Sequence, residues 1–202
     1  MKFAHIVNPV KVTQASDLYI AQPITFASMK RARANAEKEL QIELYSAQYE
    51  EDRCIIDSDF IVTPNLHRSV QDCADFKTNR KLPLVGDILQ RLYDATDAEY
   101  VIYTNVDIAL HDDFYNEVSE IIDQGFDCFS ITRRDVPAIY TKPEQLDNIF
   151  QEIGFHHTGY DCFVFRREWI PKFSLGLICI GASFIGGALL ANMVLQLSLI
   201  HI

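Results

Sequence analysis

The sequence is short of basic residues. Its 18 lysines and arginines stand against 28 aspartates and glutamates, which gives a formal net charge of −10. A protein that binds nucleic acid without regard to its base sequence needs a basic face that neutralises phosphates. We therefore expect no nucleic acid partner. An acidic chain is compatible with a site that recruits a divalent metal ion.

Closely spaced cysteines are missing too. The five cysteines are scattered and lack any CxxC spacing, and free cysteines are usually buried in proteins of reducing compartments. We expect reduced, buried thiols in a cytoplasmic protein. A chain of 202 residues buries about 70% of its unfolded surface, so its core needs no disulfide bonds. The N-terminus lacks a long apolar run, so we expect no secretory signal.

Common catalytic and nucleotide-binding motifs are also absent. The sequence contains neither GxxxxGK[ST] nor GxGxxG, which argues against P-loop and dinucleotide-binding proteins. It lacks GxSxG, the nucleophile motif of α/β-hydrolases. It lacks HExxH as well, and His156 and His157 are adjacent, a spacing that rarely ligates one zinc ion together with Asp161.

One long uncharged stretch, residues 175–195, covers 21 residues and is long enough to span a bilayer. Four glycines, Ser183 and Asn192 interrupt it, which favours a strand, a turn and a helix over one membrane helix. We expect no membrane insertion. A membrane-tethered protein anchored by residues 175–195 stays an alternative.

The last six residues, 197–202, read LSLIHI, which is the translation of a common transposase-end sequencing adaptor in one frame. We therefore expect a single domain over residues 1–196 that is incomplete at its C-terminus, followed by an adaptor-derived tail. Such a tail carries no information about the fold.

What the sequence does contain is an alternation of short apolar runs and amphipathic segments. This alternation predicts one α/β domain with a mostly parallel central sheet flanked by helices. We expect Ser28 to cap the first helix, and Asp112 and Asp113 to cap the third. Residues 57–82 are polar and irregular, and so long a loop is more often functional than idle. The predicted strands are 3–7, 42–46, 100–103, 127–132 and 162–165, and the predicted helices are 29–40, 84–92, 114–122 and 146–153.

The segment Tyr100 to Tyr103 is apolar without alternation, which predicts a strand covered on both faces at the centre of the sheet. Ligands of open parallel sheets bind outside the carboxyl ends of the strands. Asn105 and Asp107 follow this strand and, being two residues apart, are expected to project from the same side. We expect a crevice there in which Asp107 holds a cation and phosphates.

Here the sequence resembles a known family. YVIYTNVDIAL (100–110), followed by an acidic helix start, resembles the metal-binding region of GT-A-type glycosyltransferases. GYDCFVFRREW (159–169) resembles the acceptor-side strand of the same fold. The resemblance implies a GT-A (Rossmann-like) architecture over residues 3–195 and an enzyme that transfers a sugar from a nucleotide diphosphate to an acceptor hydroxyl.

The resemblance also implies a role for each candidate residue. Asp107 would hold Mn²⁺ or Mg²⁺ against the diphosphate of the donor. Asp161 would deprotonate the acceptor hydroxyl. The nucleotide base would lie near Asn8, and Arg133 or Arg134 would neutralise the phosphates.

The sequence departs from the family at Asn105, where Asp-x-Asp has its first aspartate. At about 4 Å and an effective dielectric near 20, one negative charge on a metal ligand attracts each positive charge of the ion by about 4 kcal/mol. An asparagine in place of the first aspartate gives up much of this attraction. Asp107 can still coordinate the metal, because such sites often use one or two carboxylates with substrate phosphates and water. Asn105 is then free to bind the ribose or the donor sugar. A non-catalytic protein with a glycosyltransferase-like sheet stays an alternative.

Overall fold

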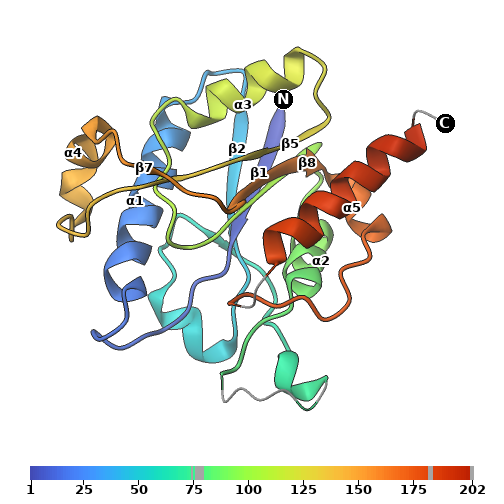
Figure 1. The fold of residues 1–202 in the computed structure, drawn as a ribbon, viewed down its shortest axis with the longest axis horizontal. Helices are drawn as coiled ribbons and strands as arrows, with labels where there is room; N and C mark the ends of the chain where they lie inside the picture. The colour runs from blue at the N-terminus through green and yellow to red at the C-terminus, as the bar shows by residue number, and fades with distance from the viewer. Residues whose placement is uncertain (74, 76–79, 182–183, 201–202) are drawn as a thin grey trace.

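Six strands form the central sheet in the order β3-β2-β1-β4-β8-β5 (Figure 1). The pairs from β3 to β4 are parallel, whereas β8 runs antiparallel to both β4 and β5. This confirms the predicted mostly parallel α/β sheet. A separate hairpin pairs β6 with β7. The strands are β1 (Lys2–Val7), β2 (Gln41–Ser46), β3 (Ile61–Val62), β4 (Tyr100–Thr104), β5 (Cys128–Ile131), β6 (Arg134–Asp135), β7 (Phe155–His156) and β8 (Cys162–Arg166).

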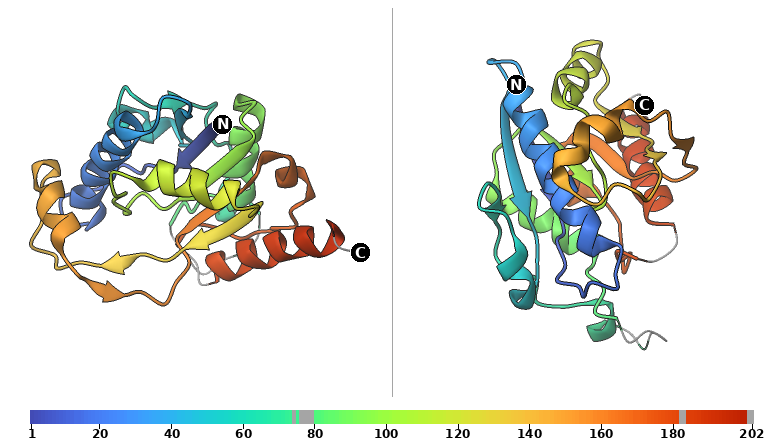
Figure 2. Two further views of the ribbon diagram at one scale, coloured as in Figure 1. Left: turned by 90° about the horizontal axis from the view of Figure 1, so that it is seen from above. Right: turned by 90° about the vertical axis from the view of Figure 1, so that its left-hand side faces the viewer.

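Helices cover both faces of the sheet. On one face, residues of α1 and α3 share a core with β1 and β4, and on the other face residues of α2 and α5 do so. Figure 2 shows α1 and α5 on opposite sides of the sheet. The helices are α1 (Leu18–Asn35), α2 (Val85–Ala95), α3 (Phe114–Asp123), α4 (Leu146–Gln151) and α5 (Ile185–Ile200), with 3₁₀ turns η1 (Glu50–Ile55), η2 (Val70–Asp72), η3 (Pro143–Gln145) and η4 (Arg167–Lys172).

The computed structural model describes residues 1–73, 75, 80–181 and 184–200. Part of the polar segment predicted to be a functional loop, including Lys77 and Asn79, therefore lies outside the described residues. So does Ser183 in the long uncharged stretch.

Strand β4 is apolar from Tyr100 to Tyr103 because both of its faces are buried. Tyr100 and Ile102 of β4 belong to the core under α1 and α3, whereas Val101 and Tyr103 belong to the core under α2 and α5. Successive side chains of a strand point to opposite faces, so burial on both sides leaves no polar position in the run.

One polar side chain, His5 of β1, is fully buried in this core. Its Nδ1 lies 2.9 Å from the Tyr115 hydroxyl of α3, and its Nε2 lies 2.8 Å from Oγ1 of Thr104 at the end of β4. Burial lowers the pKa of His5 to about 3. The neutral ring therefore fixes the end of β4 against α3 without carrying charge.

The prediction for the first helix was wrong. The helix begins at Leu18, ahead of the predicted start at residue 29, and ends at Asn35. Ser28, predicted as its cap, is buried inside it, where its hydroxyl donates to the Thr25 carbonyl and accepts from the Leu110 amide. Pro23 lies inside this helix, where it removes only one helical hydrogen bond, and burial of the apolar face outweighs that loss.

The prediction that Asp112 and Asp113 cap the third helix was also wrong. The N-cap of α3 has no side-chain hydrogen bond to the helix amides. Asp112 instead accepts from Arg31 at 2.6 Å, and Asp113 accepts from the Asn35 amide at 2.9 Å. Both carboxylates therefore tie the start of α3 to α1. The helix stops before Gly125, as expected, where φ is +96°.

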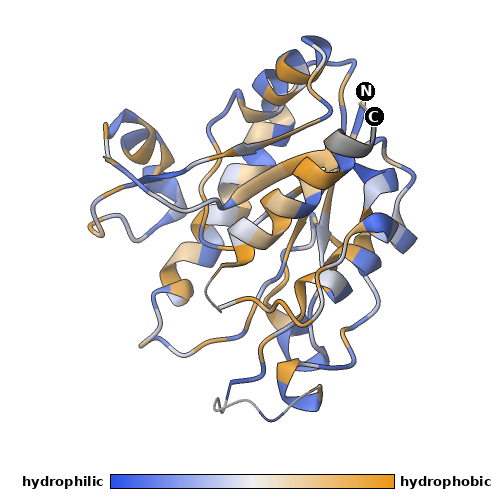
Figure 3. Cartoon of the chain, turned by 45° about the vertical axis from the view of Figure 1, so that its right-hand side comes forward, coloured by the Kyte–Doolittle hydropathy of each residue, from blue (hydrophilic) through white to orange (hydrophobic). Residues whose placement is uncertain are grey.

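Helix α5 is mostly hydrophobic in Figure 3. Leu189 and Met193 on one side are buried against the sheet, while Val194 and Leu195 are exposed. Among the residues that the structure describes, no helix combines the length and the apolar character needed to cross a bilayer. The helix continues to Ile200, past the expected end of the domain at residue 196.

All five cysteines are free thiols, as predicted. Cys162 and Cys179 are buried as expected, whereas Cys73 and Cys128 are half-buried and Cys54 is exposed, so the expectation of burial was wrong for Cys54 and only partly met for Cys73 and Cys128.

Candidate functional site

Three strands bring the predicted site residues to one edge of the sheet. Asn105 and Asp107 follow β4 directly. Because β8 is antiparallel to β4, its first residue Cys162 pairs with Thr104, which places Asp161 at the same edge. The last residue of β5, Ile131, pairs with Cys162 as well, so Arg133 also follows a strand at this edge.

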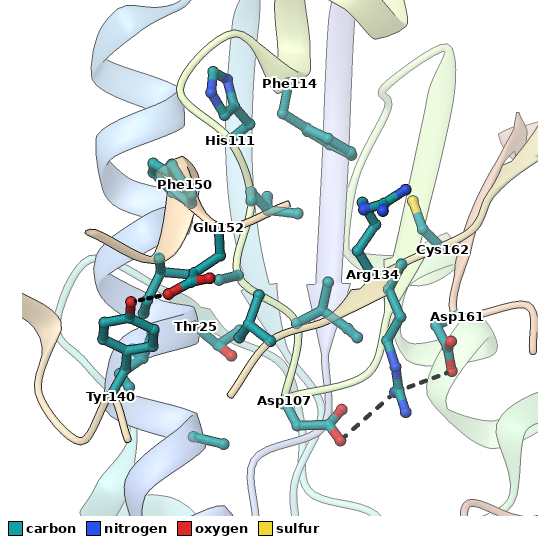
Figure 4. A pocket seen from close by; sticks show the side chains of 18 of the residues that line it. Thr25, Asp107, His111, Phe114, Arg134, Tyr140, Phe150, Glu152, Asp161 and Cys162 are labelled. Carbon is teal, nitrogen blue, oxygen red and sulfur yellow. Dashed lines mark hydrogen bonds and ion pairs between the residues drawn. The ribbon is translucent and has the colours of Figure 1, made fainter. Parts of the chain in front are cut away.

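The side chains of this edge converge on the guanidinium of Arg133. Its Nη1 lies 3.9 Å from Oδ2 of Asp107 and 3.5 Å from Oδ1 of Asp161. Figure 4 shows these two ion pairs as dashed lines, with the two carboxylates on either side. Asn105 donates from Nδ2 to the same Oδ1 of Asp161 at 3.2 Å. Four of the predicted residues therefore form one cluster.

Asp107 keeps part of its carboxylate open to solvent, with 38% of the side chain exposed. Partial removal of water raises the pKa of Asp107 above its usual range, and the nearby Asp161 charge acts in the same direction. Arg133 opposes both effects. A cation bound at this carboxylate would relieve the same cost, because it favours the ionised form.

Asp161 is more deeply buried, with 12% of its side chain exposed. Its Oδ1 faces Asn105 and Arg133, but its buried Oδ2 has no hydrogen-bond partner within the described part of the chain. A buried polar atom left without a partner calls for a physical reason, such as a catalytic role. This oxygen retains the lone pairs that a proton acceptor needs.

His157 also contacts this cluster, although it was not among the predicted site residues. Its Nε2 lies 3.7 Å from Oδ2 of Asp161, and its Nδ1 lies 3.0 Å from Oδ2 of Asp135. In the sequence, its position beside His156 indicates only a zinc site, which the adjacent spacing disfavours. Gly154 and Gly159, which flank the two histidines in GFHHTG, are the sequence signal for a tight loop at this position.

Gly159 makes this approach of His157 possible. A Cβ at position 159 would lie 2.8 Å from Nε2 of His157 and 3.6 Å from Oδ2 of Asp161. Any larger residue would therefore push the imidazole away from the candidate base.

The side chains of Arg134 and Asn8, also predicted as site residues, make their hydrogen bonds outside the cluster. Arg134 donates to the backbone carbonyls of Ile153 and, at 3.0 Å, Gly154, so its guanidinium holds the β6–β7 hairpin. Asn8, just after β1, donates to the Ala47 carbonyl at 2.6 Å and ties the ends of β1 and β2 together. The two arginines, interchangeable in sequence, thus have distinct environments.

Two cavities meet at this cluster, and Asp107 and Asp161 line both of them. We call the first the Asn8 cavity. It has a volume of about 560 Å³ and is lined by Asn8, by the end of β4 and by Tyr160. We call the second the Phe150 cavity. It has a volume of about 590 Å³ and lies between α1, α4 and the segment after β5 (Figure 4).

Few side chains of the described site could coordinate a metal ion. Within the described ranges, no group of three or more histidines, cysteines, aspartates and glutamates is placed to hold a metal ion. A cation at Asp107 would therefore depend on ligands from substrate and water, which is common for Mg²⁺.

The sheet, its single antiparallel strand and the site at the strand ends define a GT-A-like α/β fold, as predicted. The bifunctional IspDF of Campylobacter jejuni aligns with a TM-score of 0.51 and 10% sequence identity, over 95% of this chain and 47% of that one. S. aureus TarS in complex with UDP-GlcNAc aligns with a TM-score of 0.49 and 13% identity, over 85% and 47% of the two chains.

The chain spans about half the length of these solved structures. At such low sequence identities the similarity shows the fold alone. No protein-family model and no curated protein matches the chain in sequence.

Proposed function

We propose that this chain carries the donor-binding part of an enzyme that transfers a sugar from a nucleotide diphosphate to an acceptor hydroxyl. The observation that carries this proposal is the pair of carboxylates, Asp107 and Asp161, which share Arg133 and line two cavities at the strand ends. One carboxylate would serve the leaving diphosphate and the other the attacking hydroxyl.

The donor would bind in the Asn8 cavity. Its volume of about 560 Å³ falls within the usual range for small-molecule sites. The cavity runs from Asn8, beside which the base would lie, to Asn105 and Asp107. A diphosphate that reaches Asp107 also comes close to the guanidinium of Arg133, which would neutralise part of its charge. Asn105 would hydrogen-bond the ribose or the donor sugar.

Asp107 would hold Mn²⁺ or Mg²⁺, with phosphate oxygens and water as the other ligands. The residues fit such an ion, because the 3.9 Å separation between Asp107 and Arg133 is longer than a hydrogen bond and leaves the carboxylate able to coordinate. The bound metal would stabilise the charge that develops on the leaving diphosphate. Arg133 supplies a fixed positive charge for the same purpose.

Asp161 would act as the general base. The acceptor oxygen forms its bond to the anomeric carbon, the bond from that carbon to the diphosphate breaks, and the acceptor proton passes to Asp161. Its buried Oδ2 has no partner within the described residues and would take this proton. Asn105 and Arg133 hold the other oxygen and keep the carboxylate in place.

The proposal is tested by incubating the chain with UDP-, GDP-, CDP- and ADP-sugars, Mn²⁺ and a mixture of acceptor alcohols, and by measuring the released nucleoside diphosphate. We expect release from one donor class, with a rate at least about 100-fold lower in Asp107→Asn and in Asp161→Asn. Asp113→Asn is the matched control, because it removes a carboxylate at the start of α3. Equal rates in all four proteins, or no release from any donor, would favour the non-catalytic alternative.

A further inference from the structure

The Phe150 cavity has walls that are mainly apolar, although Asp107 and Asp161 line it at the cluster and its lining also includes Asp17, Glu117 and Glu152. α1 contributes Ile20 and Ile24, and α4 contributes Phe150. The segments 108–110 and 136–138 add further aliphatic side chains. An apolar cavity of about 590 Å³ exposes hydrophobic surface to water, which a monomeric protein tolerates mainly where something binds.

The walls of this cavity are braced, so its shape is already formed. The Phe150 ring packs against the His111 ring at a centroid distance of 5.0 Å, and the Arg31 guanidinium lies 5.5 Å from the Phe150 centroid. The Tyr140 hydroxyl donates to Glu152, which joins the segment after β5 to the end of α4. Figure 4 shows this contact at the far side of the cavity from Asp161.

Besides Oδ2 of Asp161, a second polar atom in the described wall has no hydrogen-bond partner and is left for a ligand. Thr25 of α1 is 1% exposed, and its Oγ1 is buried without a hydrogen-bond partner in the described part of the chain. In Figure 4, Thr25 lies between Tyr140 and Asp107 at the cavity that all three residues line. A ligand that fills this cavity would bring the missing partner within reach of the hydroxyl.

We propose that the Phe150 cavity binds the apolar part of the acceptor, an alkyl chain or aromatic ring attached to a hydroxyl-bearing head that reaches Asp161. This inference rests on the proposed function, because it uses Asp161 as the group that meets the acceptor. Donor and acceptor would approach the same pair of carboxylates from two cavities. Burial of the apolar part would supply the binding energy that an exposed sugar hydroxyl lacks.

The test is isothermal titration with two probes, octyl β-D-glucoside below its micelle concentration and 4-nitrophenyl β-D-glucoside. Ala21→Phe fills the cavity from α1, and Thr25→Val removes only the buried hydroxyl. Ala34→Phe is the matched control, because Ala34 is an exposed residue of the same helix. We expect at least one probe to bind the wild-type chain, about tenfold weaker binding in Ala21→Phe, and a several-fold loss in Thr25→Val.

A preference for the octyl probe would identify an alkyl-bearing acceptor, and a preference for the nitrophenyl probe an aromatic one. Equal affinities in the wild type and both cavity variants, or no binding of either probe, would overturn the inference.

UDP, GDP, CDP and ADP titrated into the same variants separate the two proposals. If Ala21→Phe loses the glucoside but no nucleotide binds any variant, the cavity stands and the proposed function fails. Loss of nucleotide binding in Ala21→Phe alone would assign this cavity to the donor and overturn the inference.

Discussion

The imidazole of His157 bridges two carboxylates, with Nδ1 3.0 Å from Asp135 and Nε2 3.7 Å from Asp161. The hydrogen bond from His157 lowers the pKa of Asp135, so Asp135 stays ionised and orients the ring. The β6–β7 hairpin is thereby connected to the candidate base. His157 acts through Asp161, so we regard it as a positioning residue.

Replacing His157 by alanine should slow sugar transfer about tenfold and leave nucleotide binding close to that of the wild type. The reason is that the variant loses the group facing Oδ2 of Asp161 but keeps Asp107 and Arg133. Steady-state kinetics separate the two effects, since kcat should fall while KM for the donor stays unchanged. Asp135→Asn should reproduce this loss in part. An unchanged kcat in both variants would show that the bridge has no positioning role.

Gly159→Ala tests the same contact without removing any functional group. The added Cβ would lie 2.8 Å from Nε2 of His157, so the ring must move away from Asp161. We expect a loss of kcat similar to that of His157→Ala, and little further loss in the double variant, because both changes break one interaction. Additive losses in the double variant would contradict this reading. Gly86→Ala is a suitable control, because Gly86 lies in α2 outside both cavities and a Cβ there would meet only Leu175, at 3.9 Å.

His5 should make the protein sensitive to acid. Its pKa is about 3 in the fold and 6.5 in the unfolded chain, so between these values the unfolded state binds a proton that the folded state rejects. Stability should therefore fall as pH drops below 6.5, with His5 contributing up to about 1.4 kcal/mol per pH unit. Urea unfolding of the wild type and His5→Gln at pH 7 and pH 5 measures this slope. Parallel pH profiles for the two proteins would contradict the prediction.

Helix α5 should contribute to stability through one side only. Leu189 is fully buried, whereas Leu195 is 58% exposed. Leu189→Ala should cost about 2–5 kcal/mol of unfolding free energy, and Leu195→Ala less than about 0.5 kcal/mol. Denaturant unfolding compares the two variants. Similar small losses would mean that α5 does not pack on the sheet, as the membrane-tethered alternative requires.

The inner strands β1, β4 and β8 were predictable because both of their faces are buried and mostly apolar, whereas the exposed two-residue strands β3, β6 and β7 were not predicted. No polar residue interrupts Tyr100–Thr104 at a position that would have suggested a surface strand, and the burial in the structure explains why. The start of α1 was not predictable from pattern, because its buried face depends on contacts with strands that are distant in sequence. Ser28 looks like a helix cap in sequence, yet it lies inside α1 and bonds to Leu110.

The site was predictable in its composition but not in its geometry. Asp107 and Asp161 could be named because each adjoins an apolar strand, but their meeting depends on the antiparallel pairing of β4 with β8. Arg133 and Arg134 could not be told apart, because two adjacent side chains point to opposite sides and the sequence does not show which side faces the site. Only the β6–β7 hairpin assigns Arg134 to backbone carbonyls.

The most direct test of the account is calorimetric titration of UDP, GDP, CDP and ADP into the chain with Mn²⁺, repeated with EDTA, in the wild type, Asp107→Asn and Asp113→Asn. We predict that at least one nucleotide binds the wild type and Asp113→Asn equally. Binding should weaken about tenfold or more in Asp107→Asn and when the metal is chelated. Equal binding by Asp107→Asn, or no binding of any nucleotide to the wild type, would contradict the assignment of Asp107 to the donor diphosphate.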